Sequence, residues 1–135
     1  MKEIWAIILA AGESKRMKAP KMLLPFNGKT MIELVIENVI RSKVFRTLVV
    51  LGSYRDEILG SISHLPVYHC YNENYRKGML SSVQCGFKYL PADFEAALVF
   101  PGDQPFIEPD IINLIIKSYR EKRKGIIVPM YGKKR

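Results

Sequence analysis

The chain has 135 residues, the length of one domain, with 48% hydrophobic and 25% charged residues, as in an ordinary globular protein. No apolar run reaches the roughly 18 residues of a membrane-spanning helix, so we expect no membrane partner. The net charge is +8, but from Lys117 onward eight basic residues stand against the single acid Glu121. We interpret this local excess as a solvated helix end and chain end, and expect no nucleic-acid partner.

Five short, mostly continuous apolar runs predict strands that are buried on both faces. They lie at residues 4–10, 47–52, 67–71, 97–100 and 126–129. The first run follows a charged start and could be confused with a signal peptide. Glu3 in its flank and the cations that follow the run favour a buried strand instead.

Amphipathic segments alternate with these runs and predict helices at residues 29–43, 56–63, 80–90 and 109–124. Thr30 and Glu33 have the spacing of a capping box at the start of the first helix. The alternation predicts an α/β fold: a three-layer α/β/α domain with a mainly parallel, doubly wound sheet. Ligands bind at the carboxyl ends of the strands in such folds, where the loops 11–21, 72–82 and 101–106 would lie along one edge.

The loop after the first predicted strand combines small residues with cations. Ala10, Ala11 and Gly12 would let a ligand approach the backbone closely, and free N–H groups can face phosphate oxygens. Arg16 can clamp a phosphate with two hydrogen bonds, and Lys21 supplies a point charge. The spacing matches neither a P-loop nor a G-x-G-x-x-G pattern. Two interpretations stay open, a triphosphate site and a basic surface loop.

The other two loops offer a carboxylate and hydroxyl groups. Asp103 follows a buried strand, directly after Gly102, at a place that suits either a Mg²⁺ ligand or a turn residue. Gly78 precedes a predicted helix that has Ser81 and Ser82 in its first turn. These hydroxyls would either cap the helix or face a base or ribose.

Brought together at one edge, the three loops predict a nucleotidyl-transfer site. In that reaction an acceptor oxygen attacks the α-phosphorus of a nucleoside triphosphate, and pyrophosphate leaves. Transfers of this type depend mainly on positioning and on charge stabilisation. Arg16, Lys21 and a metal ion on Asp103 would be the catalytic groups that stabilise this charge.

Three stretches, in the same order, also resemble a known family. "LAAGESKRMKAPKMLLPF" is similar to the L-A-A-G-x-S-x-R-M-G-x-x-K-x-L-L-P signature of the MobA-like NTP transferases. "GMLSSVQCGF" resembles the G-M-x-x-S-[LV]-x-x-G segment of their molybdenum cofactor cytidylyltransferase branch, and "GDQP" resembles its metal-binding motif. The resemblance implies a nucleotide-diphospho-sugar transferase fold of Rossmann-like type and Mg²⁺ as cofactor. It implies transfer of CMP from CTP to molybdopterin carrying molybdenum, with a molybdoenzyme as protein partner.

The resemblance also assigns roles to residues of this chain. Residues 10–12 are expected to contact base and ribose, Arg16 and Lys21 to hold phosphates, Ser82 to lie near the base, and Asp103 to bind Mg²⁺. The full set expected to bind the nucleotide is Leu9, Ala10, Ala11, Gly12, Arg16, Lys21, Gly78, Ser81, Ser82 and Gly102.

Two departures from the family pattern leave alternatives open. Lys18 stands where the family has a glycine. Family members also usually continue beyond the segment that resembles residues 128–135, so we expect these 135 residues to form one nucleotidyltransferase domain without the family's last part. Acceptor-binding residues and a second metal ligand would then lie beyond Arg135. The alternatives are GTP as donor, a sugar or alcohol phosphate as acceptor, or a non-catalytic nucleotide-binding accessory protein for a molybdenum hydroxylase.

The cysteines and histidines predict no site of their own. Cys70, in a strand pattern, and Cys85, in a helix pattern, are expected as small buried apolar residues, which suits a reducing cytoplasm. His64 and His69 have no third partner at metal-ligand spacing, and we expect both to be structural.

Overall fold

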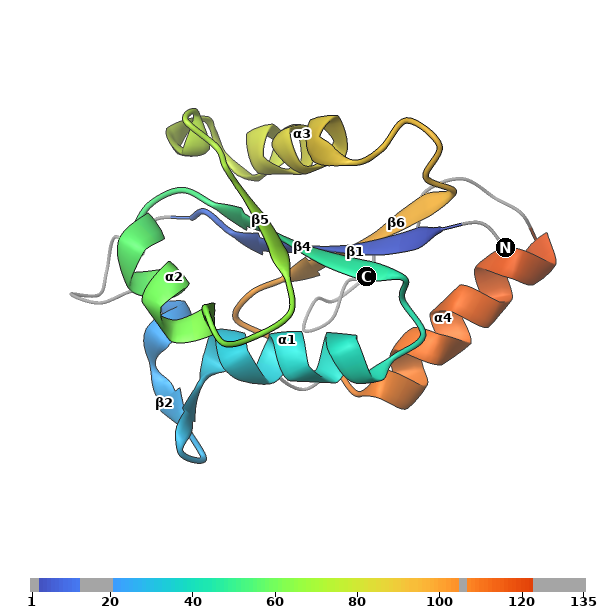
Figure 1. Ribbon diagram of the computed structural model, residues 1–135, viewed down its shortest axis with the longest axis horizontal. Coiled ribbons are helices and arrows are strands. Elements are labelled where there is room, and N and C mark those ends of the chain that lie inside the picture. The colour runs from blue at the N-terminus through green and yellow to red at the C-terminus, as the bar shows by residue number, and fades with distance from the viewer. Residues whose placement is uncertain (1–2, 13–20, 105–106, 123–135) are drawn as a thin grey trace.

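Figure 1 shows a computed structural model of the chain, which describes residues 3–12, 21–104 and 107–122. The main sheet has four parallel strands in the order β5-β4-β1-β6. Their bounds are Ile4–Ala10 for β1, Arg46–Leu51 for β4, Tyr68–Tyr71 for β5 and Ala96–Pro101 for β6. From β1 the chain adds β4 and β5 on one side and then returns to add β6 on the other. The strand order therefore reverses between β1 and β6, which is where folds of this type bind ligands.

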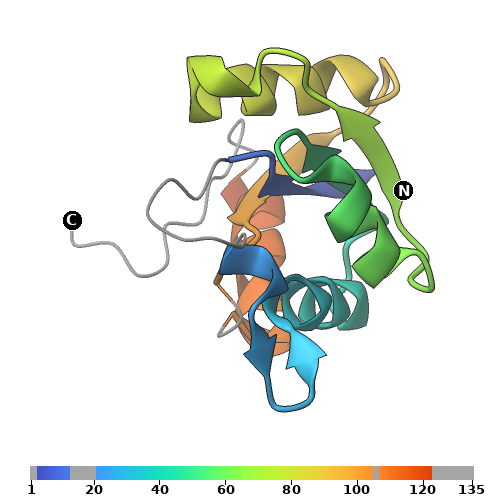
Figure 2. The same ribbon diagram turned by 90° about the vertical axis from the view of Figure 1, so that its left-hand side faces the viewer.

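Helices cover both faces of this sheet. α3 (Met79–Tyr89) lies on one face, and α1 (Met31–Arg41), α2 (Arg55–Ile62) and α4 (Pro109–Lys122) lie on the other, as Figures 1 and 2 show. The predicted three-layer α/β/α architecture with a parallel sheet is confirmed. Within the three described ranges, none of the helices combines the length and the apolar character that crossing a bilayer requires.

Strand β1 is apolar along its whole length because helices cover both of its faces. Ile4, Ala6 and Ile8 pack into one core cluster with residues of α1 and α4. Trp5 and Ile7 pack into a second cluster on the α3 side. Because successive side chains of a strand point to opposite faces, a strand covered on both faces loses the polar half of its alternation.

The first helix begins as the sequence predicts. The Thr30 side chain accepts a hydrogen bond from the backbone N–H of Glu33 at 3.2 Å, and the Glu33 carboxylate accepts one from the Thr30 N–H at 2.8 Å. Both halves of the capping box are therefore present. The other predicted strands and helices with described residues are present, and their ends differ by up to two residues. The predicted strand at 126–129 and the end of the last predicted helix, at 123–124, lie outside the described residues.

Two short features between β1 and α1 were not predicted. A 3-10 turn, η1 (Lys21–Leu23), precedes an antiparallel hairpin of β2 (Pro25–Phe26) and β3 (Lys29–Thr30). Asn27 and Gly28 form the hairpin's turn with φ angles of 54° and 82°. An Asn-Gly pair is a strong signal for this kind of turn, because both of its central residues need positive φ. The hairpin was therefore readable from the sequence.

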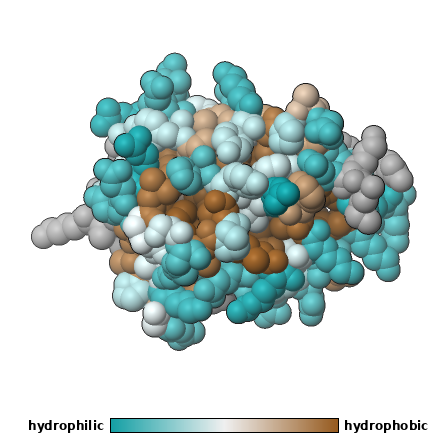
Figure 3. All heavy atoms as spheres, viewed as in Figure 1, coloured by the Kyte–Doolittle hydropathy of each residue, from teal (hydrophilic) through white to brown (hydrophobic). Residues whose placement is uncertain are grey.

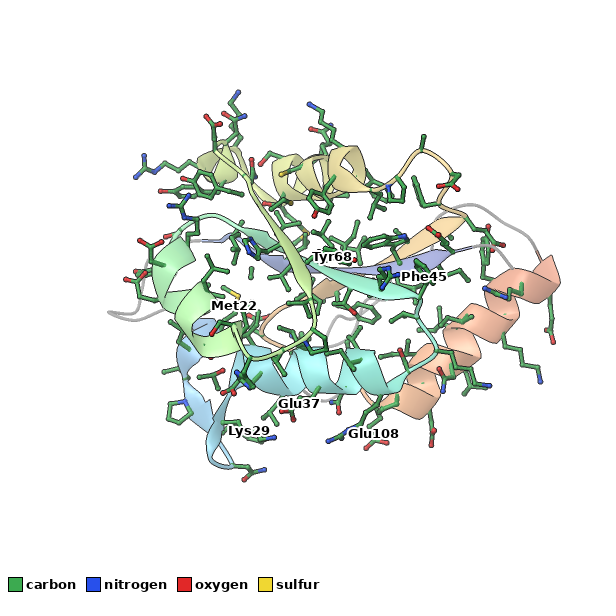
Figure 4. The ribbon with its side chains drawn as sticks, in the orientation of Figure 1. Met22, Lys29, Glu37, Phe45, Tyr68 and Glu108 are labelled. Atoms are coloured by element: carbon green, nitrogen blue, oxygen red, sulfur yellow. The ribbon has the colours of Figure 1, made fainter. Side chains whose placement is uncertain are left out.

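An aromatic cluster lies at the amino ends of the strands. Trp5 contacts Phe45 and Tyr68, with ring centroids 6.2 Å and 5.7 Å apart, and Arg46 stacks over Phe45. Figure 4 labels Phe45 and Tyr68 on this side, and Figure 3 shows apolar side chains gathered on the same face of the molecule. A hollow of about 110 Å³ lined by Phe45, Arg46 and Tyr68, among others, opens here. It lies at the opposite end of the sheet from the three loops discussed next.

Candidate functional site

The first and third loops meet directly at the carboxyl ends of β1 and β6. Leu9 is the register partner of Pro101, and the next N–H, that of Gly102, donates a hydrogen bond to the Leu9 carbonyl oxygen at 2.9 Å. A Cβ at position 102 would come within 2.8 Å of the same oxygen and within 2.9 Å of the Met22 sulfur. Gly102 is thus glycine because the Leu9 carbonyl and two buried side chains, those of Met22 and Ile32, close around it.

The contact at Gly102 also places the neighbouring site residues. Asp103 follows Gly102, and Lys21 precedes Met22 at the start of η1 (Lys21–Leu23). Met22 is 7% exposed and belongs to the core cluster that also holds Ala10. Lys21 and Asp103 were predicted from separate loops. Each is the sequence neighbour of one of two residues that pack together, Met22 and Gly102. Arg16 and Lys18 fall outside the described residues.

The small residues of the first loop are small for two different reasons. Ala10 and Ala11 are 0% and 2% exposed and pack in the cores on opposite faces of the sheet. Gly12 is exposed, and no heavy atom of the described residues would lie within 4 Å of a Cβ built on it. Packing therefore accounts for the two alanines, whereas Gly12 is the residue of the three that presents open backbone at the edge.

The first and second loops meet at Gly52, a residue that sequence reasoning missed. A Cβ on Gly52 would lie 2.7 Å from the Tyr75 Cβ and 2.8 Å from the Ala11 Cβ. The Ser53 N–H also donates to the Ala11 carbonyl at 3.2 Å. Gly52 follows directly after β4, and this position at a strand's carboxyl end was the available signal. The packing of Gly52 between Ala11 and Tyr75 thus holds η2 (Tyr75–Lys77) against the first loop.

The second loop is organised by Asn72, the other residue that was missed. Asn72 is 4% exposed, and its side-chain N–H₂ donates to the hydroxyl oxygens of Ser81 and Ser82 at 2.9 Å and 3.0 Å. Its side-chain oxygen accepts from the Asn74 N–H at 2.9 Å. A buried polar side chain with all these bonds fixes the loop against α3. The sequence signal that could have identified Asn72 is its position, one residue after β5 and nine residues before Ser81.

Gly78 and the serines do not form the ordinary side-chain cap that one interpretation expected. The cap position of α3 is Gly78 itself, which has φ of 107° and offers no side-chain hydrogen bond. The Ser81 hydroxyl instead lies 2.7 Å from the Gly78 carbonyl oxygen, and Ser82 is buried against Asn72. The positive φ explains glycine here, because other residues rarely adopt it. The serines thus belong to a network that joins the strand end to the first turn of the helix.

Asp103 is partly exposed at this edge, directly after β6. Among the residues that the structure describes, no group of three or more His, Cys, Asp or Glu side chains could hold a metal ion. Mg²⁺ in nucleotide sites takes one or two carboxylates and fills its remaining positions with phosphate oxygens and water. A single carboxylate such as that of Asp103 could therefore supply the protein ligand of a Mg²⁺ ion that arrives with a nucleotide.

Comparison with known proteins identifies the family. The model of the MobA-like NTP transferase domain matches residues 6–135. The chain belongs to this family. The resemblance of the first motif to the MobA-like NTP transferases is thereby confirmed.

The chain is also similar to individual proteins. It is 30% identical, over 93% of its length, to the "Probable molybdenum cofactor guanylyltransferase" of Natranaerobius thermophilus, of which it covers 59%. It is 33% identical, over 89% of its length, to the "Bifunctional protein GlmU" of Caldicellulosiruptor saccharolyticus, of which it covers 26%. A solved nucleotidyl transferase from Methanothermobacter thermautotrophicus matches 85% of this chain and 57% of its own, with a TM-score of 0.78 and 28% identity. The chain thus spans less than two thirds of each of these relatives.

Proposed function

We propose that this chain binds a nucleoside triphosphate at the carboxyl edge of its sheet and takes part in nucleotidyl transfer. The proposed reaction moves CMP from CTP to a phosphorylated acceptor, molybdopterin carrying molybdenum. The observation that best supports this is the meeting of three loops at the reversal between β1 and β6. They are joined by the Gly102–Leu9 contact and by the packing of Gly52 against Ala11 and Tyr75. Membership of the MobA-like NTP transferase family supports the triphosphate.

In the proposed reaction, an oxygen of the acceptor phosphate attacks the α-phosphorus of the nucleotide. The bond between that phosphorus and the bridging oxygen breaks, and pyrophosphate leaves with the electron pair. The chain's contribution is positioning: Gly12 presents open backbone, and Asn72 holds Ser81 and Ser82 in place. Arg16 and Lys21 would hold the phosphates, an assignment that rests on the sequence motif. Asp103 would hold Mg²⁺, which when bound neutralises phosphate charge.

Pyrophosphate release from each of the four nucleoside triphosphates, with and without molybdopterin, tests the proposal. We expect release that requires CTP, Mg²⁺ and the acceptor together. Arg16→Ala should weaken CTP binding about ten- to a hundredfold, the worth of a charge-assisted phosphate contact. Arg41→Ala is the matched control, because Arg41 is an exposed cation in the last turn of α1. Equal CTP affinity of wild type and Arg16→Ala would return the first loop to a basic surface loop.

GTP is the second candidate donor, and one observation favours it. The relative from Natranaerobius thermophilus, 30% identical to this chain, is named a guanylyltransferase. The Ala-Ala-Gly start of the first motif favours CTP by resemblance. The same four-nucleotide assay separates the two, since release with GTP and not with CTP would reassign the donor and leave the transfer chemistry unchanged.

A further inference from the structure

The two cysteines of the chain lie next to each other, on different elements. The sulfur of Cys70, in β5, is 3.7 Å from the sulfur of Cys85, in α3. Both are free and pack against the apolar core on the α3 side, but they are partly exposed and not buried as the sequence predicted. The chain has no further cysteine. Two thiols this close, held by a strand and a helix, need only a small approach to reach the roughly 2.05 Å of a disulfide.

The surroundings of the pair decide which sulfur reacts first. Burial, together with the neighbouring Cys85 sulfur, raises the pKa of Cys70 to about 12. Cys70 therefore stays protonated at neutral pH, and Cys85 is the sulfur that attacks. Once Cys85 is bonded to another sulfur its thiol is gone, and its part in raising the pKa of Cys70 disappears. Cys70 is then easier to deprotonate at the moment when it must react.

We propose that Cys70 and Cys85 form a reversible intramolecular disulfide by exchange with a low-molecular-weight disulfide, and that this bond weakens nucleotide binding. In the first step the Cys85 thiolate attacks the small disulfide, forms a mixed disulfide and releases one small thiol. In the second, Cys70 loses its proton, attacks the Cys85 sulfur and releases the second thiol. The two cysteines are oxidised, the small disulfide is reduced to two thiols, and no other reactant is needed.

The pair is coupled to the candidate site by its position. Asn72 lies two residues beyond Cys70, and Ser82 lies three residues before Cys85, close to one helical turn. The hydrogen bonds from Asn72 to Ser81 and Ser82 cross the same junction between β5 and α3 that the disulfide would tighten. Figure 2 shows the end of β5 leading up to the layer of α3. Formation of the disulfide shifts this junction and distorts the hydrogen bonds of Asn72. The expected effect on nucleotide binding rests on the proposed function.

Formation of the bond is tested on the full chain with oxidised glutathione, followed by digestion without reductant. Trypsin cuts after Arg76 and Lys77, between the cysteines, so a disulfide joins the peptides 56–76 and 78–88. We expect these linked peptides from monomeric protein, and their loss on adding dithiothreitol. Cys70→Ala should instead accumulate a glutathione adduct on Cys85, because the second step is blocked. Glutathione adducts on wild type with no linked peptides would overturn the proposal.

The consequence is tested by calorimetry with CTP and GTP on reduced and oxidised protein. We expect the oxidised form to bind about tenfold more weakly, the size of one lost hydrogen bond, and Cys85→Ala, which lacks the sulfur that attacks first, to bind equally before and after treatment. Linked peptides with unchanged affinity would overturn the coupling to the site. If reduced protein binds neither nucleotide, the proposed function fails, and linked peptides would still establish the disulfide.

Discussion

The backbone N–H of Gly102 donates a hydrogen bond to the carbonyl oxygen of Leu9 at 2.9 Å. This bond extends the β1–β6 ladder by one step beyond the last strand residue, Pro101. It fixes the distance between the loop that begins with Ala11 and the loop that carries Asp103. A ligand that touches both loops therefore meets a preformed edge, which reduces the ordering cost of binding.

Gly102→Ala should destabilise the protein and weaken nucleotide binding. The new methyl group would meet the Leu9 carbonyl oxygen at 2.8 Å and the Met22 sulfur at 2.9 Å. Backbone cannot yield as a flexible side chain can, so we expect a loss of about 1–3 kcal/mol in the free energy of unfolding. Urea unfolding and CTP calorimetry measure the two effects.

Gly60→Ala is the matched control for that substitution. Gly60 lies inside α2, and within the part of the chain that the structure describes a Cβ there would have no heavy atom within 4 Å. The same change of residue should therefore stabilise by about 0.5–1 kcal/mol, through helix propensity. If both alanine variants behaved alike, the close approach at Gly102 would not be what holds the two loops together.

The sequence predicted the layers of this fold because its strongest signals are local. Continuous apolar runs, the helical spacing around Val35 and the Thr30–Glu33 box each depend on neighbours within a few residues. The alternation of strands and helices then limits the topology to a parallel sheet. Boundaries differed by up to two residues because the ends of elements are set by tertiary hydrogen bonds, such as that from the Asn72 N–H to the Leu51 carbonyl.

The parts of the site that escaped prediction depend on contacts between distant segments. Gly52 matters through Ala11 and Tyr75, forty-one residues before it and twenty-three after it. In the sequence Asn72 cannot be told from other polar loop residues, because its role depends on its hydrogen bonds to Ser81 and Ser82. Local patterns carry no record of such pairings. The same limit explains why the sequence did not predict the contact between Cys70 and Cys85.

Asp103→Asn should remove most Mg²⁺-dependent pyrophosphate release and leave the fold intact. The amide is nearly isosteric but lacks the negative charge that would hold the metal at the phosphates. We expect a loss of about 3 kcal/mol of transition-state stabilisation, roughly a hundredfold in rate. Pyrophosphate release is measured against MgCl₂ concentration.

Asp110→Asn is the control and should keep wild-type turnover, because Asp110 is an exposed carboxylate in the first turn of α4. Unchanged turnover of Asp103→Asn at saturating Mg²⁺ would make Asp103 a turn residue only.

Glu33→Gln should lower stability at neutral pH and have no effect in acid. The hydrogen bond from the Thr30 backbone, followed by that from its side chain and by the charges of His64 and Lys29, holds the pKa of Glu33 below its ordinary value, and burial opposes this shift. Because the pKa of Glu33 is lower in the folded state, its carboxylate stabilises the fold at pH values above the ordinary pKa of 4.5. This stabilisation is lost as the pH falls through the lowered pKa of the folded state. Glutamine keeps the hydrogen bonds without the charge, so we expect a loss of about 0.5–1 kcal/mol at pH 7.

Urea midpoints of wild type and Glu33→Gln, measured from pH 7 down to about 2, test this. The difference should shrink between the ordinary pKa of Glu33 and its lowered folded value. Because the His64 ring lies 3.4 Å from the Glu33 carboxylate, the comparison is repeated with His64→Asn in both proteins, which removes a second titrating group. A difference that stayed constant down to the lowest pH would show that the charge of Glu33 plays no part.

Asn72→Ala should weaken nucleotide binding only while Ser81 and Ser82 are present. Asn72 positions both hydroxyls, and its removal leaves them and the Asn74 N–H without that partner, at a cost of about 1–3 kcal/mol in the free energy of unfolding. If the serines contact the nucleotide, we expect about tenfold weaker binding from Asn72→Ala alone. In a chain that already carries Ser81→Ala and Ser82→Ala, the same change should leave affinity unchanged, because there is no hydroxyl left to position. Asn74→Ala is the control, since the hydrogen bonds that join Asn74 to Asn72 and Ser81 use its backbone N–H and carbonyl. An equal loss of affinity in both backgrounds would mean that Asn72 acts on the nucleotide by itself, as a ligand and not through the serines.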